Sequence, residues 1–189
     1  MENVRRIRKL GSSFGSLAIA LALILPASPA FAATDGVLGA QSSGSINISA
    51  SVANRVRITG LTDVSFLNQD AGIASTSSQN ICVWSNTATR GYSIRATGSG
   101  AANAFTLSSG TSSVGYSVQW NDASGSTTGT VLSAGATSTG YTSTATHQSC
   151  STGVASSASL IVGIGTTDLS SMQAGLTYTG ALTLLVSPE

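Results

Sequence analysis

The sequence predicts an all-β sandwich of about seven or eight strands, and three observations support this prediction. Short runs in which apolar residues alternate with serine, threonine or other polar residues recur along the chain, a period that is typical of strands with one buried face. Segments rich in glycine, asparagine and aspartate separate these runs. After residue 32, no useful length of the chain has the period of an amphipathic helix.

The first and last of these runs are strongly patterned. Residues 44–53 place four apolar side chains on one face, namely Ile46, Ile48, Ala50 and Val52. Residues 178–186 do the same near the C-terminus with Tyr178, Leu182, Leu184 and Val186. Because the ends of a domain fray unless they are tied down, such patterns imply partner strands. An N-terminal strand that precedes the main domain suggests a strand meant for another molecule.

The remaining runs and the turns between them complete the expected sandwich. Strands are predicted within residues 56–66, 82–84, 92–96, 114–120 and 158–164. Turns or loops are predicted at 99–100, 121–125 and 166–168. Residues 123–146 are the least patterned, which predicts a long surface loop with one or two short strands. Tyr141 lies in this loop and is the one aromatic residue expected to be exposed, since most of the others fall on the apolar phase of their strands.

The N-terminus has the three parts of a secretory signal peptide. Arg5, Arg6, Arg8 and Lys9 precede an apolar run at 17–25, and Ala30-Phe31-Ala32 provides a cleavage site. The apolar run is too short to span a bilayer, so no membrane insertion is expected. We therefore predict a signal peptide at 1–32, a flexible leader at 33–43, the N-terminal strand at 44–53 and a domain at 54–189. The product is expected to be exported.

The charge of the exported chain excludes two classes of partner. After residue 32 the sequence has four arginines, no lysine and six acidic residues, which is a formal charge of −2. A basic nucleic-acid footprint and a polybasic membrane patch are therefore both missing from the sequence.

Two cysteines, Cys82 and Cys150, are present, and an even count in an exported protein favours a disulfide over free thiols. Closing a loop of this length contributes roughly 4 kcal/mol in the chain-entropy model. A metal site is disfavoured, because two distant cysteines and the single His147 match no ligand spacing. No cofactor is indicated.

No catalytic residue is predicted. His147 lies in a loop rich in serine and threonine, where a Ser–His–Asp set can be drawn by chance. The sequence has no G-x-S-x-G elbow or paired-carboxylate motif in a credible context.

Four stretches together resemble the spore coat protein U domain, which includes subunits of archaic chaperone–usher pili. They are the run at 44–53, Cys82 with Gly91-Tyr92-Ser93-Ile94, Val114–Val118 with Asn121-Asp122, and the ending Ala174–Leu184. The resemblance covers essentially the whole exported chain, and its most specific part is the C-terminal run. The chain departs from the family pattern at Val56, near which a cysteine is often found, and in its ending Ser187-Pro188-Glu189.

The resemblance implies an incomplete immunoglobulin-like sandwich that lacks its last strand. The N-terminal strand of a neighbouring subunit would complete it, after a periplasmic chaperone has filled the groove transiently and an outer-membrane usher has received the subunit. Residues Ile46, Ile48, Ala50 and Val52 would then be donated, and the C-terminal strand would line the acceptor groove. The expected function is that of a structural subunit of a surface pilus that serves adhesion or biofilm formation.

A second interpretation stays open at this point. The run at 44–53 could be the first strand of its own complete sandwich, and the protein would then be a secreted surface or carbohydrate-binding module. The aromatic residues could provide a sugar-stacking face in that case.

Overall fold

The computed structural model describes residues 32–189, so that the predicted signal peptide lies outside the described residues apart from Ala32. The chain divides into two units between Ser51 and Val52, and each is described by itself. The second unit is nearly all β. Its elements are β1 (Val56–Thr59), β2 (Ser75–Ser85), β3 (Gly91–Gly98), the 3₁₀ turn η1 (Ala101–Asn103), β4 (Thr106–Ser109), β5 (Ser112–Gly115), β6 (Ser117–Asn121), β7 (Thr130–Val131), β8 (Thr137–Thr142), β9 (Ala158–Ile164), α1 (Thr166–Ser171) and β10 (Leu182–Pro188).

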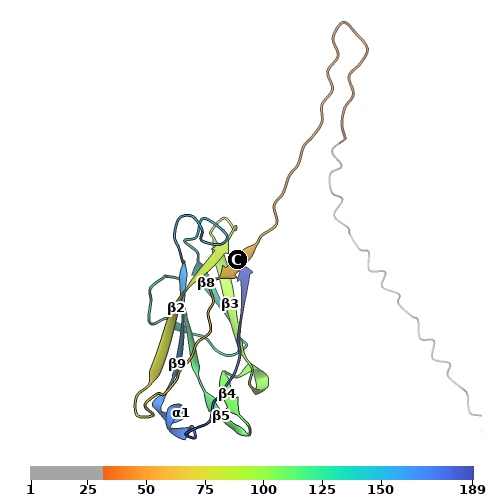
Figure 1. Cartoon of the computed structure of the whole chain (residues 1–189). Helices are drawn as coiled ribbons and strands as arrows, with labels where there is room; N and C mark the ends of the chain where they lie inside the picture. The colour runs from red at the N-terminus through yellow and green to blue at the C-terminus, as the bar shows by residue number, and fades with distance from the viewer. Residues whose placement is uncertain (1–31) are drawn as a thin grey trace, which may run out of the picture. The chain divides into compact units, whose positions relative to one another are not determined.

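The strands form antiparallel sheets, which confirms the predicted all-β, sandwich-like fold. One sheet has the order β1-β2-β9-β6-β7, a second has the order β10-β3-β8, and β4 and β5 form a separate hairpin. Helix α1 and the β4–β5 hairpin lie at one end of the domain, and the C-terminus lies at the other (Figure 1).

The core lies between the two larger sheets and is built on aromatic residues. Trp120 and Tyr92 are fully buried, and the Trp120 indole N–H donates to the Tyr92 hydroxyl at 3.0 Å. Tyr141 stacks on Tyr92 with ring centroids 5.7 Å apart. Burial raises the pKa of Tyr92 far above the usual range of a phenol, because its ionised form would lose its hydration. The interior therefore keeps its polar groups only where they are paired.

The predicted disulfide is present. Cys82 and Cys150 are joined with their Cα atoms 5.9 Å apart, and both are buried. The bond ties β2 to the loop that connects β8 with β9. The same loop is held by the buried hydroxyls of Ser143 and Ser157, both of which donate to the Val83 carbonyl.

Two predictions about local structure are corrected. Residues 166–168 begin a short helix instead of a turn, with Gly165 extended before it and the acidic Asp168 in its first turn. The run at 114–120 is not one strand, since it divides into β5 and β6. The division occurs because the Gly115 N–H donates to the Asp168 carboxylate at 2.8 Å and the Tyr116 N–H donates to the Phe105 carbonyl at 2.9 Å.

Two aromatic predictions are also corrected. Tyr141 lies on β8 and is 8% exposed, so it belongs to the core and not to an exposed loop surface. Tyr178 lies outside β10, which begins at Leu182. Before β10 the backbone pairs with β4 and not with β3, since Thr179 forms a bridge with Ser108. The predicted long loop at 123–146 does contain two short strands, β7 and β8.

The described part of the first unit, residues 32–51, has little regular structure. Its one bridge joins Thr34 to Ser45, with backbone hydrogen bonds of 3.0 and 2.9 Å. Within the described residues, the alternating run at 44–53 pairs with no strand. The structure of residues 32–189 contains no helix that is long and apolar enough to cross a membrane.

Removal of the disulfide tests how strongly the β8–β9 loop depends on it. The double variant Cys82→Ser/Cys150→Ser should lose roughly 2–4 kcal/mol of unfolding free energy, because the cross-link restricts the unfolded chain. Urea unfolding followed by tryptophan fluorescence measures the loss. Alkylation of two thiols in the unreduced native protein would contradict the assignment.

Candidate functional site

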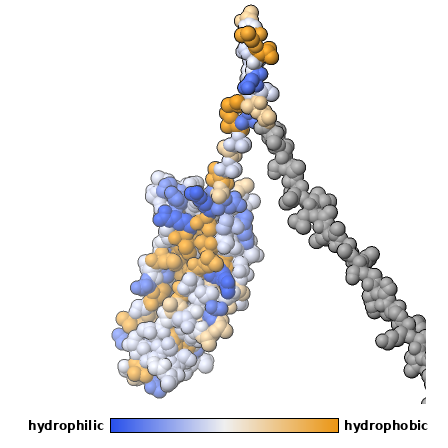
Figure 2. Space-filling model, turned by 90° about the vertical axis from the view of Figure 1, so that its right-hand side faces the viewer, coloured by the Kyte–Doolittle hydropathy of each residue, from blue (hydrophilic) through white to orange (hydrophobic). Residues whose placement is uncertain are grey.

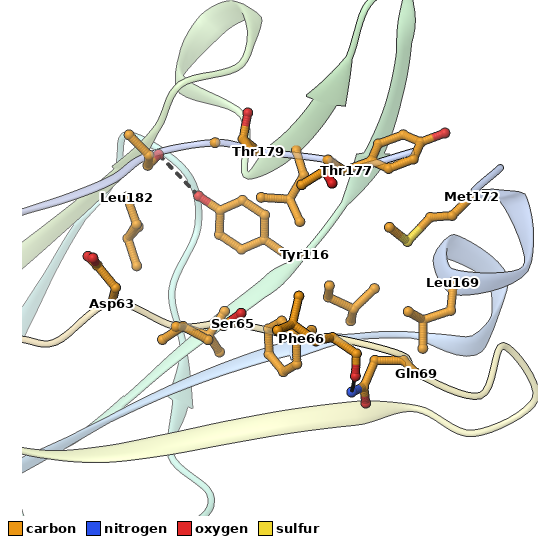
Figure 3. A pocket seen from close by; sticks show the side chains of 18 of the residues that line it. Asp63, Ser65, Phe66, Gln69, Tyr116, Leu169, Met172, Thr177, Thr179 and Leu182 are labelled. Atoms are coloured by element: carbon orange, nitrogen blue, oxygen red, sulfur yellow. Dashed lines mark hydrogen bonds between the residues drawn. The ribbon is translucent and has the colours of Figure 1, made fainter. Parts of the chain in front are cut away.

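A groove runs along the half of the domain that contains α1 and the β4–β5 hairpin, which is called the lower half below. It lies between two segments that are far apart in sequence. One wall is the chain that leads into β10, residues 172–184, and the other is the segment at 61–69 after β1. The floor comes from β9 and from Tyr116 and Leu107, and the cavity volume is about 1070 Å³. Figure 3 shows Leu182 and Tyr116 pointing into the space that Phe66 and Leu169 also face.

The β10 wall has an unpaired backbone edge. The Ser99 N–H donates to the Ala181 carbonyl, and the Glu189 N–H donates to the Gly91 carbonyl. The backbone N–H and C=O groups of the odd-numbered residues of β10 therefore point toward β3. The N–H and C=O groups of Leu182 and Leu184 therefore point to the other side, where β10 has no partner strand among the described residues. An edge with exposed donors and acceptors is a template for a further strand.

The apolar side chains along this edge are only half covered. Leu182, Leu184 and Val186 pack against the core, yet each remains partly exposed. On the opposite wall Val64 and Phe66 also pack on the core and are half-buried. The side of the domain that bears β10 faces the viewer in Figure 2 and shows a band of apolar residues. The groove thus offers both backbone hydrogen bonds and apolar surface.

The wall that leads into β10 is firmly fixed. Thr179 exchanges backbone hydrogen bonds of 3.0 and 2.8 Å with Ser108 of β4. The Ala181 N–H donates to the Ser99 hydroxyl at 3.0 Å, and the Tyr116 hydroxyl donates to the Ala181 carbonyl at 3.3 Å. The Tyr178 hydroxyl lies 3.0 Å from that of Ser112. This wall is therefore joined by hydrogen bonds to the chain just after β3, to β4 and to the β5–β6 segment.

The two tyrosines of the groove have pKa values shifted in opposite directions. The Ser112 hydroxyl and the Gln173 N–H, which stabilise a phenolate, lower the pKa of Tyr178 below its ordinary value. Burial raises the pKa of Tyr116. No group of three or more potential metal-ligating side chains occurs among residues 32–189.

The residues predicted for the site are located as follows. Leu182, Leu184 and Tyr178 line the groove, while Val186 packs against the core farther along β10. In the N-terminal run, Ile46, Ile48 and Val52 are 73%, 86% and 82% exposed, and Ala50 is exposed as well.

Sequence reasoning missed the wall at 61–69 and most of the floor. The alternation of Val64 and Phe66 in this wall predicts an ordinary strand, because a period of two does not reveal whether a strand is paired. His147 is half-buried, and its Nδ1 lies 3.0 and 2.8 Å from the hydroxyls of Ser149 and Ser151. This cluster lies in the disulfide loop and does not line the groove.

No protein-family model matches this sequence, and no curated protein matches it.

Alkaline unfolding tests the two tyrosine environments. Above pH 10 the unfolded chain releases the Tyr116 proton while the folded protein keeps it, so this group lowers stability as pH rises. Tyr116→Phe should reduce the loss of stability between pH 10 and 12. Tyr178 has the opposite sign, because its folded pKa is lowered, and the stabilisation it contributes is present above pH 10 and lost as pH falls through the folded pKa. Tyr178→Phe should therefore remove a gain in stability as pH rises from the lowered folded pKa to 10, and should leave the slope between pH 10 and 12 unchanged, as measured by urea unfolding at each pH. The same slope in both variants would contradict the assignment.

Proposed function

We propose that this protein is a structural subunit of a surface pilus that polymerises by donor-strand exchange. In this proposal the run at 44–53 of one subunit fills the groove of the next. The observation that best supports it is the edge of β10, which has no partner strand among the described residues and lies beside an apolar groove. The alternating run at 44–53 belongs to no strand in the described structure, where its one bridge joins Ser45 to Thr34.

The physical reason for insertion is the cost of the open groove. Backbone groups and apolar side chains at the β10 edge are left to water in the isolated subunit. An added strand satisfies the backbone through main-chain hydrogen bonds, and its alternate side chains fill the groove and fix the register. Ile46, Ile48, Ala50 and Val52 are spaced for this role, and ten extended residues reach roughly 33 Å.

Such an interaction is head-to-tail and generates a fibre. Donor and acceptor are different surfaces of the same chain, and heterologous contacts of this kind build open filaments unless a rotation closes them into a ring. A subunit with an open groove is prone to aggregate before assembly. A periplasmic chaperone that covers the groove, and an outer-membrane usher that exchanges it for the neighbouring strand, are therefore the partners we propose. Adhesion or biofilm formation is the proposed role of the fibre at the cell surface.

The alternative, a self-complete carbohydrate-binding module, receives less support. Sugar-stacking sites use exposed aromatic faces. Among residues 32–189 no tryptophan, tyrosine or phenylalanine is classed as exposed, and Trp84, the most obvious candidate, is packed beside the disulfide.

The variant Ile48→Asp tests donation directly. It should abolish fibres while soluble subunit persists, because the exposed Ile48 makes little contribution to the fold of its own subunit. In the groove of a neighbour the new carboxylate would be desolvated, at a cost on the order of several kcal/mol per junction. Electron microscopy of the cell surface, together with the amount of periplasmic subunit, measures the effect.

Asn47→Asp is the matched control, since it adds the same charge one residue away on the opposite face of the strand. Fibres should form normally in this variant. Loss of the soluble protein in Ile48→Asp would instead support a strand that belongs to its own sandwich. Normal fibres in Ile48→Asp would contradict donation.

A further inference from the structure

The wall at 61–69 continues the side-chain pattern of β1 after the backbone pairing of β1 has ended. β1 pairs with β2 from Val56↔Ser85 to Thr59↔Cys82. Beyond this point no strand is assigned, yet Val64 and Phe66 pack on the core with the same even-numbered phase as Val56 and Ile58. The side chains between them, from Asp63 and Ser65, are exposed. The segment thus has the alternation of a strand without its hydrogen bonds.

The lower half of β2 has a free edge that matches this segment. The Asn86 N–H donates to the Arg55 carbonyl, so the even-numbered residues of β2 direct their backbone groups toward β1. From Cys82 back toward the start of β2, the same edge consists of the backbone groups of Asn80, Ser78 and Thr76. These residues have no partner strand on that side in the described chain. If the β1–β2 register continued, these residues would face Leu61, Asp63 and Ser65.

The side chain of Gln79 already holds β2 and the segment at 61–69 in this register. The Thr62 N–H and hydroxyl donate to Gln79 Oε1 at 2.8 and 3.0 Å, and Gln79 Nε2 donates to the Thr62 carbonyl at 3.2 Å. Thr62 and Gln79 are the residues that would lie opposite each other if the ladder were extended. In the described structure, the backbone N–H and C=O groups of residues 63–66 form no hydrogen bond with other backbone groups. The segment is therefore aligned with β2 but not paired to it.

Gly60 explains why the pairing stops where it does. Its φ is +87°, in the left-handed region that turns the chain out of a regular strand. A Cβ built at Gly60 would meet its nearest atoms at 3.7 Å, so space does not prevent another residue there. The end of the pairing thus coincides with a backbone conformation that a regular strand does not have.

We propose that residues 61–66 form a conformational switch that extends β1 along β2 when the groove is filled. Gln79 acts as a positioning residue that keeps the register, and Gly60 is the hinge. This inference rests on the proposed insertion of a strand into the groove. An inserted strand pairs with the even-numbered backbone groups of the extended wall, and the odd-numbered groups of the same wall pair with β2. The firmly fixed wall beside β4 stays in place, so that filling the groove orders one wall only.

Residue-resolved amide hydrogen exchange of the chain beginning at Ala33 tests this switch, with a synthetic peptide of residues 44–53 as the probe. The peptide should slow exchange at Leu182 and Leu184, which report groove filling, and also at Asp63 and Ser65, which report pairing with β2, by about tenfold or more. Protection of Leu182 and Leu184 without Asp63 and Ser65 would overturn the switch and leave strand insertion intact. Protection at none of the four would overturn both.

Two variants separate the hinge from the register. Gly60→Ala disfavours positive φ and should slow exchange at Asp63 and Ser65 without any peptide, while Val64 still exchanges quickly because its N–H faces the empty groove. Gln79→Met should reduce peptide-induced protection at Asp63 and Ser65 and keep that of Leu184. Gln148→Met, in the loop between β8 and β9 and outside the groove lining, is the control, since its exposed side chain makes no hydrogen bond in the described structure and the variant should behave as wild type. Unchanged exchange in both Gly60→Ala and Gln79→Met would overturn the proposed roles of these residues.

Discussion

The unpaired backbone edge of β10 is the constraint on which the rest of this structure depends. An edge strand leaves one row of backbone N–H and C=O groups without strand partners, and burying such groups without hydrogen bonds is costly. β10 has β3 on one side and open groove on the other. The apolar side chains of Leu182 and Leu184 remain half-exposed for the same reason. A protein that keeps such an edge needs either a partner or another way to cover it.

The two halves of the domain meet this constraint differently. In the half of the domain that carries the disulfide, Ile81 and Val83 of β2 pack in the core with Trp120. The disulfide joins β2 to the loop between β8 and β9. In the lower half the corresponding side chains of β2 are Ser75, Ser77 and Gln79, which are polar and half-buried. The apolar core on β2 is therefore confined to the half near the disulfide, and beside the groove β2 contributes polar side chains. In the proposed function, this separation would let one chain remain folded while it presents an open edge at β10.

The walls of the groove differ in the same way. The segment before β10 is fixed by backbone bonds to Ser108 and by Tyr116 of the floor. The segment at 61–69 is held to β2 through side chains, by Gln79 at Thr62 and by the Ser75 hydroxyl, which donates to Gln69. A fixed wall can set the register of an incoming strand, and a movable wall can adapt to it. The proposed function and the proposed switch both follow from this difference.

The sequence by itself determined the all-β class, the disulfide and the apolar faces of the C-terminal and core strands, because alternation and cysteine count report local burial directly. It also identified residues 44–53 as an alternating run. It did not reveal that the run at 114–120 breaks at Tyr116, that Tyr141 is buried, or that Val64 and Phe66 form one wall of a groove, since each depends on contacts with distant residues. Alternation shows which side of a strand is apolar, but only the tertiary structure decides which backbone edges find partners. That difference is physical: side-chain burial follows a pattern within one strand, whereas hydrogen bonding in a sheet requires a second one.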